Sequence, residues 1–240
     1  MLAAVGRVLR QKLSGVSGRG FSMKSRLVTL GSLLTAFSVL VASAQPIPPD
    51  RVEDIRQIIS VLVGNRMSEL NALLAANPVL ASAFKPPGGY IVVVSDSRSL
   101  CVIESKPPGA DCTASMDARA IQESSELSGV PEALRTALLA QNQERTPLPS
   151  IAAPAVKLAT AASINAMFVS KNGWKTFYAQ YPGSFGFVEI SIPTFSPDCD
   201  HALTYLHHGC GSLCGTGYLV YLTRVDGIWR IEENALLWIS

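Results

Sequence analysis

Apolar residues recur every three to four positions in the first third of the chain, a spacing typical of amphipathic helices. It predicts a first helix over 52–63, with Asp50 as its N-cap and Glu53 completing a capping box. The glycine–asparagine pair at 64–65 predicts a break in the helix. A second helix is expected from there to about 77, followed by a short third piece that reaches Phe84.

The middle of the chain mixes strand-like, helical and proline-rich segments. Runs at 90–95 and 99–105 surround a short turn and predict a β-hairpin. A helix is expected over 128–142, where three leucines form an apolar stripe. The proline-rich stretch 146–158 predicts an extended connection, after which Ser163 is expected to cap a short helix.

After a short aromatic helix predicted at 172–182, the pattern changes to alternating apolar and polar positions. Four strand-length runs follow, at 187–195, 201–207, 217–225 and 229–240. Since their connections are short, neighbouring strands are expected to be antiparallel. The predicted fold class is α+β: N-terminal helices and a β-hairpin, then a four-stranded antiparallel meander packed against helices, with a cystatin-like cone as one arrangement.

The basic and apolar start of the chain has the composition of an export signal. From Met23, the basic residues Lys24 and Arg26 precede an uncharged, mostly apolar run over 27–41, and small residues follow it. Cleavage is expected after Ala44, so the protein is predicted to be exported, to the periplasm or the extracellular space. The alternative is an uncleaved signal that anchors the chain in a membrane, for which the apolar run is short.

This signal divides the chain into three parts. Residues 1–44 comprise an upstream extension, 1–22, and the signal itself. A helical segment with a disulfide-stapled hairpin is expected over 45–127, and a helix plus antiparallel-sheet module over 128–240. No composition shift or repeat suggests a further division.

The net charge changes sign once the leader is set apart. Six of the 20 basic residues and none of the 18 acidic ones lie in 1–44, which leaves residues 45–240 with a net charge of −4. A mildly acidic body lacks the basic surface that nucleic-acid binding needs, so nucleic acid is excluded as a partner.

All five cysteines follow the expected cleavage point, and export makes disulfides their expected state. Cys101 and Cys112 are expected to pair locally, which would stabilise the fold by about 2–3 kcal/mol for so short a loop. For the remaining three, either Cys210 and Cys214 are bridged or one of them pairs with Cys199. Because the number is odd, at least one thiol is free, metal-bound or joined to another chain.

The last part of the chain carries a distinctive series of motifs. A tryptophan–aromatic helix leads to a Tyr-Pro turn, a Cys-Gly-x-Leu-Cys-Gly-x-Gly hairpin tip follows, and the final strand contains Asp-Gly-x-Trp and Trp-x-Ser. The matching residues are Trp174, Phe177, Tyr181, Pro182, Ser191, Ala202, Leu203, Tyr205, Cys210, Gly211, Leu213, Cys214, Gly215, Gly217, Asp226, Gly227, Trp229, Trp238 and Ser240. This series resembles a C-terminal module of uncharacterised exported bacterial proteins, which has no assigned activity. His207, His208 and Cys199 depart from its pattern.

A histidine–cysteine cluster over 199–214 is the main candidate for chemistry. It holds all three histidines of the chain, and zinc or copper accepts both ligand types. However, His207 and His208 are adjacent, so on a strand they point to opposite faces. His207, His208 and Cys199 are therefore weak metal candidates, and a stapled hairpin tip is the favoured interpretation. A metal-binding protein or a thiol- or metal-dependent enzyme that uses this cluster is the alternative.

Other signatures of catalysis do not fit the sequence. The glycines over 209–217 lie between two predicted strands, whereas a phosphate-binding loop needs a helix after it. No Gly-x-Ser-x-Gly motif marks a nucleophilic serine, and Ser191 is expected to be structural. Glu232 and Glu233 are expected on solvated faces of a strand.

Large aromatic residues near the predicted sheet could line a ligand cleft, although filling the space between helix and sheet is the favoured interpretation. They are Trp174, Tyr181, Tyr205, Trp229 and Trp238. The sequence thus predicts an exported, non-catalytic protein that binds a small ligand or another protein and needs no cofactor.

Overall fold

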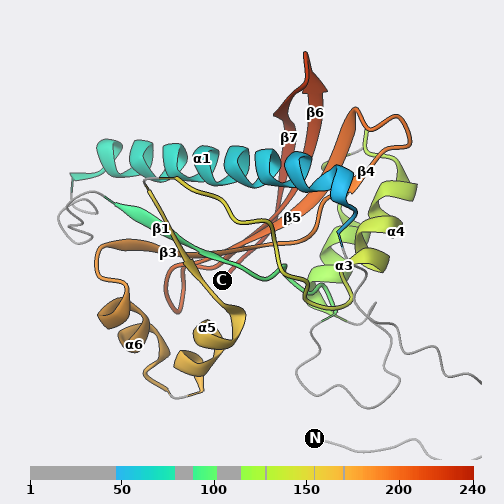
Figure 1. The fold of residues 1–240 in the computed structure, drawn as a ribbon. Helices are drawn as coiled ribbons and strands as arrows, with labels where there is room; N and C mark the ends of the chain where they lie inside the picture. The colour runs from blue at the N-terminus through green and yellow to red at the C-terminus, as the bar shows by residue number, and fades with distance from the viewer. Residues whose placement is uncertain (1–46, 79–88, 102–114, 128, 154, 170) are drawn as a thin grey trace, which may run out of the picture. The chain divides into compact units, whose positions relative to one another are not determined.

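The structure, a computed structural model, describes residues 47–78, 89–101, 115–127, 129–153, 155–169 and 171–240. These residues belong to one unit that extends from Ala42 to Ser240. In this part of the chain a seven-stranded, mostly antiparallel sheet lies between one long helix and four shorter ones (Figure 1). The α+β class predicted from the sequence is confirmed.

The long helix, α1 (Val52–Ala76), follows one turn of 3-10 helix, η1 (Pro49–Arg51). The break predicted at 64–65 is wrong, because Gly64 lies exposed within the continuous helix. One interior glycine costs about 1 kcal/mol, and the buried stripe along α1 outweighs it. The predicted cap is also wrong: Asp50 lies in η1, and Arg51 precedes α1 without a side-chain cap hydrogen bond.

The strands are β1 (Tyr90–Val94), β2 (Val156–Ala159), β3 (Ser184–Ile190), β4 (Thr194–Phe195), β5 (His201–Gly209), β6 (Thr216–Val225) and β7 (Ile228–Ile239). They are ordered β2-β1-β3-β5-β6-β7, and β4 also pairs with β5. Three of the four runs with period two each form one strand, whereas the run at 187–195 is divided between β3 and β4. β3, β5, β6 and β7 pair antiparallel in that order.

The hairpin predicted over 90–105 is wrong in the part that the structure describes. β1 pairs in parallel with β2 on one side and with β3 on the other, so both of its edges are occupied. Residues 99–101 are not a strand, and 102–105 lie outside the described residues. β2 arises within the stretch that was expected to be an extended connection. As a result, the segments 45–127 and 128–240 contribute strands to one sheet.

The shorter helices are α3 (Met116–Glu123), α4 (Glu132–Gln141), α5 (Ala161–Phe168) and α6 (Gly173–Gln180). α4 and α6 form where helices were predicted. The cap of α5 is Thr160 rather than Ser163, because the Thr160 hydroxyl accepts a hydrogen bond from the Ser163 backbone N–H at 3.1 Å.

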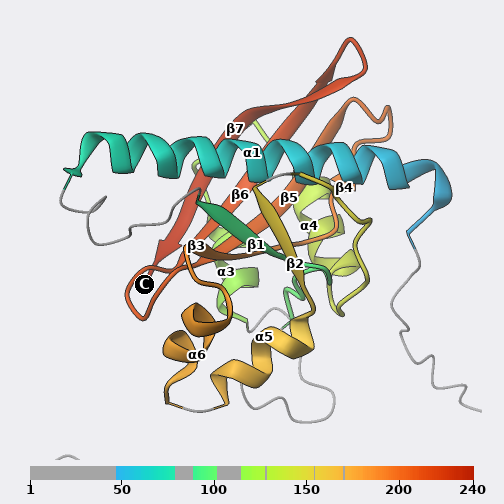
Figure 2. The same ribbon diagram turned by 60° about the vertical axis from the view of Figure 1, so that its left-hand side comes forward.

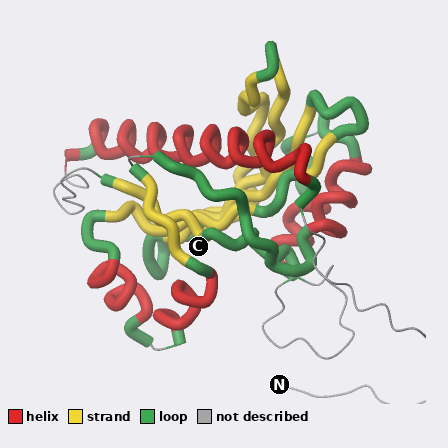
Figure 3. The backbone as a smooth tube through the Cα atoms, in the orientation of Figure 1, coloured by secondary structure: helices red, strands yellow, loops and turns green. Residues whose placement is uncertain are grey.

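The sheet is covered on both faces (Figures 2 and 3). Strand side chains alternate between the faces, so Ile91 and Leu206 pack under α1 in one apolar core. On the opposite face Val92 packs with residues of α5 and α6, and Leu203 packs with residues of α3 and α4. This second face carries the polar residues described below.

A Gly64→Ala variant tests the continuity of α1. We expect the free energy of unfolding to rise by about 1 kcal/mol, since alanine is the better helix former and nothing lies within 4 Å of the added methyl group. Urea unfolding measures it. The control is Gly186→Ala in β3, where φ is +98° and a Cβ would overlap the carbonyl oxygen of Gly209, so stability should fall. A loss of stability in Gly64→Ala would contradict a continuous helix.

Candidate functional site

The two adjacent histidines of β5 point to opposite faces of the sheet, as predicted. His207 contacts Glu189 of β3, with Nδ1 at 3.0 Å from Oε2. His208 faces α1, where its Nδ1 lies 2.9 Å from Arg66 Nη2. Cys199 precedes β5, and its sulfur lies 2.8 Å from Arg51 Nη2. The structure therefore does not bring the three metal candidates together. In the described part of the chain, no group of three His, Cys, Asp or Glu residues could hold a metal ion.

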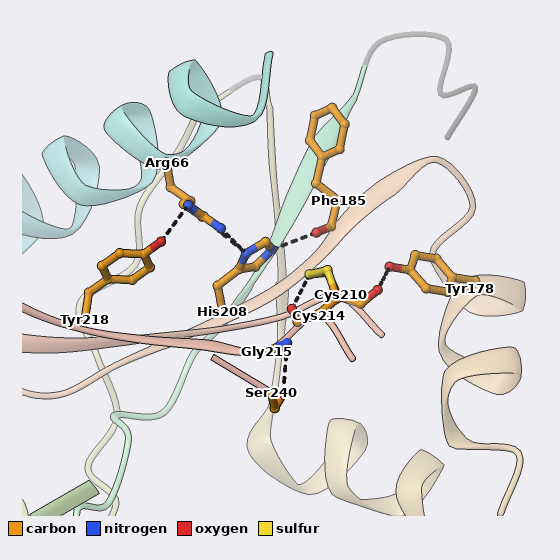
Figure 4. The surroundings of a disulfide bond; sticks show 9 residues. All are labelled: Arg66, Tyr178, Phe185, His208, Cys210, Cys214, Gly215, Tyr218 and Ser240. Carbon is orange, nitrogen blue, oxygen red and sulfur yellow. Dashed lines mark hydrogen bonds between the residues drawn. A yellow bond between two sulfur atoms is a disulfide. The ribbon is translucent and has the colours of Figure 1, made fainter. Parts of the chain in front are cut away.

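His208 is fully buried between α1 and the sheet (Figure 4). Its Nδ1 accepts from Arg66, so its Nε2 donates to the carbonyl oxygen of Phe185 at 2.7 Å. Arg66 also contacts Tyr218 at 3.3 Å and Glu69 at 2.8 Å. Burial, with the guanidinium beside the ring, lowers the pKa of His208 to about 4. The ring is therefore neutral at neutral pH.

Cys210 and Cys214 form a disulfide that staples the turn between β5 and β6 (Figure 4). The Tyr178 hydroxyl of α6 donates to the Cys210 carbonyl oxygen at 2.8 Å. Beside the staple, Gly215 and Ser240 exchange two hydrogen bonds, so the turn also holds the end of β7. The predicted hairpin tip is thus present. Cys112 lies outside the described residues, so its pairing with Cys101 stays a prediction.

The aromatic residues proposed for a cleft do not gather in one place. Trp174 and Tyr181 pack with α5 and α6. Trp229 is buried on the α1 side, where its indole N–H donates to Asp54 at 3.1 Å. Tyr205 and Trp238 meet at another place on the sheet, with Trp238 Nε1 3.0 Å from the Tyr205 hydroxyl oxygen.

A buried carboxylate, that of Glu189, holds three partners on the face opposite α1. Arg98 Nη1 and Arg145 Nη2 each donate to it at 2.6 Å, and His207 contacts it at 3.0 Å. Burial opposes ionisation of Glu189, but hydrogen bonding by His207 and the two guanidinium charges outweigh it and hold its pKa far below the usual range. Glu189 is therefore a fixed negative charge.

Asp117 of α3 extends this cluster toward β7. Arg98 Nη2 donates to Asp117 Oδ2 at 2.9 Å, and the Tyr205 hydroxyl donates to Oδ1 at 2.7 Å. The indole N–H of Trp238 lies 3.1 Å from the same oxygen. Burial, then the Asp117 charge, raises the pKa of Tyr205 well above its ordinary value, so the phenol stays protonated. We call these residues, with Glu189, Arg145 and His207, the ionic network.

The ionic network adjoins a groove between α3 and the end of β7. This cavity has a volume of about 560 Å³, within the range of small-ligand sites. Its lining residues are Met116, Arg119, Ala120, Glu123, Ser124, Ser125, Glu126, Leu236, Leu237 and Trp238. Trp238 belongs to both groove and network. A Cβ at Gly217 would overlap its indole and the Tyr205 hydroxyl, so the ring needs glycine there.

Sequence reasoning missed four residues of the ionic network, namely Glu189, Asp117, Arg98 and Arg145, although it named Tyr205, His207 and Trp238 for other roles. Glu189 is a lone charge among apolar residues of a strand, which is a signal for a buried and paired carboxylate. Its partners lie 91 and 44 positions away, in segments whose approach no local pattern reveals. Ser191 is buried and bonded to Thr204 at 3.1 Å, so its structural role is confirmed. Glu232 and Glu233 are solvent-exposed, as predicted.

Comparison with family models, with curated proteins and with solved structures found no match. The resemblance of the C-terminal segment to an exported module therefore stays a prediction. Among the residues that the structure describes, none of the helices has the length and apolar character to cross a membrane.

The neutral state of His208 predicts a loss of stability in mild acid. Its folded pKa of about 4 lies below the unfolded value of about 6.5, so its contribution is fully present above pH 6.5 and is lost as pH falls toward 4. Between pH 7 and pH 5 the free energy of unfolding should drop by about 2 kcal/mol. Urea unfolding at both pH values measures this drop.

His208→Gln supplies the comparison, since an amide keeps a donor for Phe185 and an acceptor for Arg66. This variant should lose about 2 kcal/mol less than the wild type between the two pH values. Equal pH dependence in both proteins would show that His208 is not the group that titrates.

Removing the charge of Glu189 should destabilise the fold strongly. Glu189→Gln leaves Arg145 without its carboxylate partner, while Arg98 keeps Asp117. Removing one partner of a buried ion pair costs about 3–5 kcal/mol. Chemical unfolding at pH 7 measures the loss. The matched change Glu232→Gln, at an exposed site, should stay within about 0.5 kcal/mol of wild type. If both variants match wild type, the ionic network does not stabilise this face.

Proposed function

We propose that the chain is an exported, non-catalytic protein that binds a small ligand or a protein partner in the groove between α3 and β7. One observation carries this proposal: the indole of Trp238, which lines the groove, is held in place by Asp117 and the Tyr205 hydroxyl. A rigid ring beside a cavity favours binding, because less conformational freedom is lost when a ligand arrives.

Trp238 is the residue that connects the cavity with the buried cluster. Its indole N–H is held by both Asp117 and Tyr205, and Asp117 is itself fixed by Arg98. One face of the ring can therefore be presented to a ligand without rearrangement. Aromatic rings of this kind supply a large contact area with few rotatable bonds.

The charges near the groove support binding rather than catalysis. Glu189 and Asp117 are each occupied by donors, so they serve as anchors for neighbouring side chains. Tyr205 has its pKa raised away from neutral pH and donates its proton to Asp117. A general acid or base works best with a pKa near the operating pH, and the pKa values of Glu189 and Tyr205 are shifted away from it.

Export is part of this proposal and rests on the sequence. The basic and apolar segment from Met23 to Ala44 supports it. The Cys210–Cys214 disulfide is consistent with an oxidising compartment. We also propose that β3, β5, β6 and β7 form a meander in a cystatin-like cone arrangement, which the packing of one long helix, α1, against a face of that sheet supports.

The indole resonances provide a direct assay for binding in the groove. In a two-dimensional ¹H–¹⁵N spectrum each indole gives one N–H peak, and Trp238→Phe identifies the peak of Trp238. We expect probes from a set of small amphipathic aromatic acids, amines and short peptides to shift that peak. The reason is that a ligand on the ring changes its magnetic environment directly.

Trp229 is the internal control, because it is 1% exposed and packs on the other face of the sheet. Its peak should stay fixed when the Trp238 peak moves. A probe set that leaves Trp238 unmoved, or that moves both peaks equally, would argue against the groove as the binding site.

A further inference from the structure

We infer that the occupant of the groove is an extended peptide segment with basic and apolar residues, which adds to the sheet as a strand beside β7. This inference rests on the proposed function and names the class of its ligand. It joins three independent features: a free strand edge, a helix that runs beside it, and an excess of negative charge.

The first feature is the position of β7 at the edge of the sheet. Within the described residues β7 pairs with β6 alone, so its other edge offers backbone N–H and C=O groups to a new strand. Bulges at Glu232 and Leu237 interrupt its ladder, and the regular stretch between them is 233–236. Pairing is therefore expected over this stretch and into the groove that begins at Leu236.

The second feature is the groove itself, which has a strand on one side and a helix on the other. Leu236, Leu237 and Trp238 supply the strand side, and the exposed flank of α3 supplies the helix side. Peptides that add to a sheet edge gain affinity from main-chain bonds and specificity from pockets for alternate side chains. Here Trp238 and the half-buried Leu237 offer an apolar contact for such a side chain.

The third feature is charge. Glu123 and Glu126 line the groove from the helix side, and Glu232 and Glu233 lie on β7. Within the described residues none of these four carboxylates forms an ion pair with a lysine or arginine; Glu232 has only a 3.8 Å contact with His201. Arg119 also lines the groove and Arg230 lies on β7, so the four carboxylates outnumber these two cations by two. Two excess negative charges favour a basic segment.

A second copy of the same chain fits this edge less well. Antiparallel pairing of two β7 strands over 233–236 would set Glu233 opposite Leu236, but it would bring Glu232 and Glu233 of both copies to one interface. Like charges across paired strands are destabilising. A basic peptide meets the same carboxylates with opposite charge, so it is the occupant that the edge favours.

Fluorescence anisotropy with a defined probe tests the inference. The probe is a labelled hexapeptide of alternating lysine and valine, titrated with the full mature chain at low salt. We expect saturable binding that weakens at least about tenfold in the double variant Glu123→Lys, Glu126→Lys. Glu144→Lys is the matched control, since Glu144 is exposed and outside the groove, and it should bind nearly as wild type.

Backbone methylation separates strand addition from simple charge attraction. Methyl groups on alternate amides block one edge of the peptide, and two isomers block the two edges in turn. Strand addition uses one edge only, so one isomer should lose binding and the other should keep it. If neither isomer or both isomers lose binding, the peptide is not added as a strand. A glutamate–valine hexapeptide that binds as well would overturn the charge argument.

The outcomes also distinguish this inference from the proposed function. Should aromatic or amine probes move the Trp238 resonance while the lysine–valine peptide fails to bind, the groove is a binding site for another ligand class and the inference is wrong. Should neither bind, both proposals fail. Size-exclusion chromatography without a probe tests the remaining occupant. A dimer whose stability changes in Glu233→Arg would identify a second copy of the chain as the occupant instead.

Discussion

The burial of one carboxylate, that of Glu189, constrains the face of the sheet opposite α1. Its neighbours in β3, Val188 and Ile190, pack under α1. A slip of one residue would exchange the faces and place the charge in that apolar core. The pairing of Glu189 with His207 across β3 and β5 therefore fixes the register. Because Arg98 and Arg145 bind the same carboxylate, the loops that carry them are fixed too.

Two adjacent histidines of β5 lie on opposite faces of the sheet, and each has a polar partner there. His207 lies against a carboxylate, whereas His208 lies against the guanidinium of Arg66. Each side chain is held by an element from another part of the chain. Buried ion pairs add little net stability compared with apolar packing, but breaking one is costly. Their main effect here is to specify which segments meet.

The spacing of apolar residues along the chain predicted the type of several helices and strands correctly. β5 and β6 form at two of the strand-length runs, although β5 is buried at nearly every position rather than alternately. The buried stripe of α1 continues through the region where the glycine–asparagine pair suggested a break. The predicted hairpin partner of β1 was wrong. The apolar run of β1 is buried on both faces, and such a run indicates a parallel strand rather than a hairpin. β2 escaped detection since it is only four residues long and half exposed. The ionic network joins residues far apart in sequence, which no local period can reveal.

Edge strands usually need protection from unwanted pairing, and β7 has that protection along most of its length. Two bulges interrupt its ladder, and the carboxylates of Glu232 and Glu233 discourage strands that are acidic. The regular stretch between the two bulges, 233–236, ends at Leu236, where the groove against α3 begins. A strand that pairs there must also fit beside the helix and accept the negative charge of Glu123. The features that prevent general aggregation therefore also narrow the class of partner that this edge can accept.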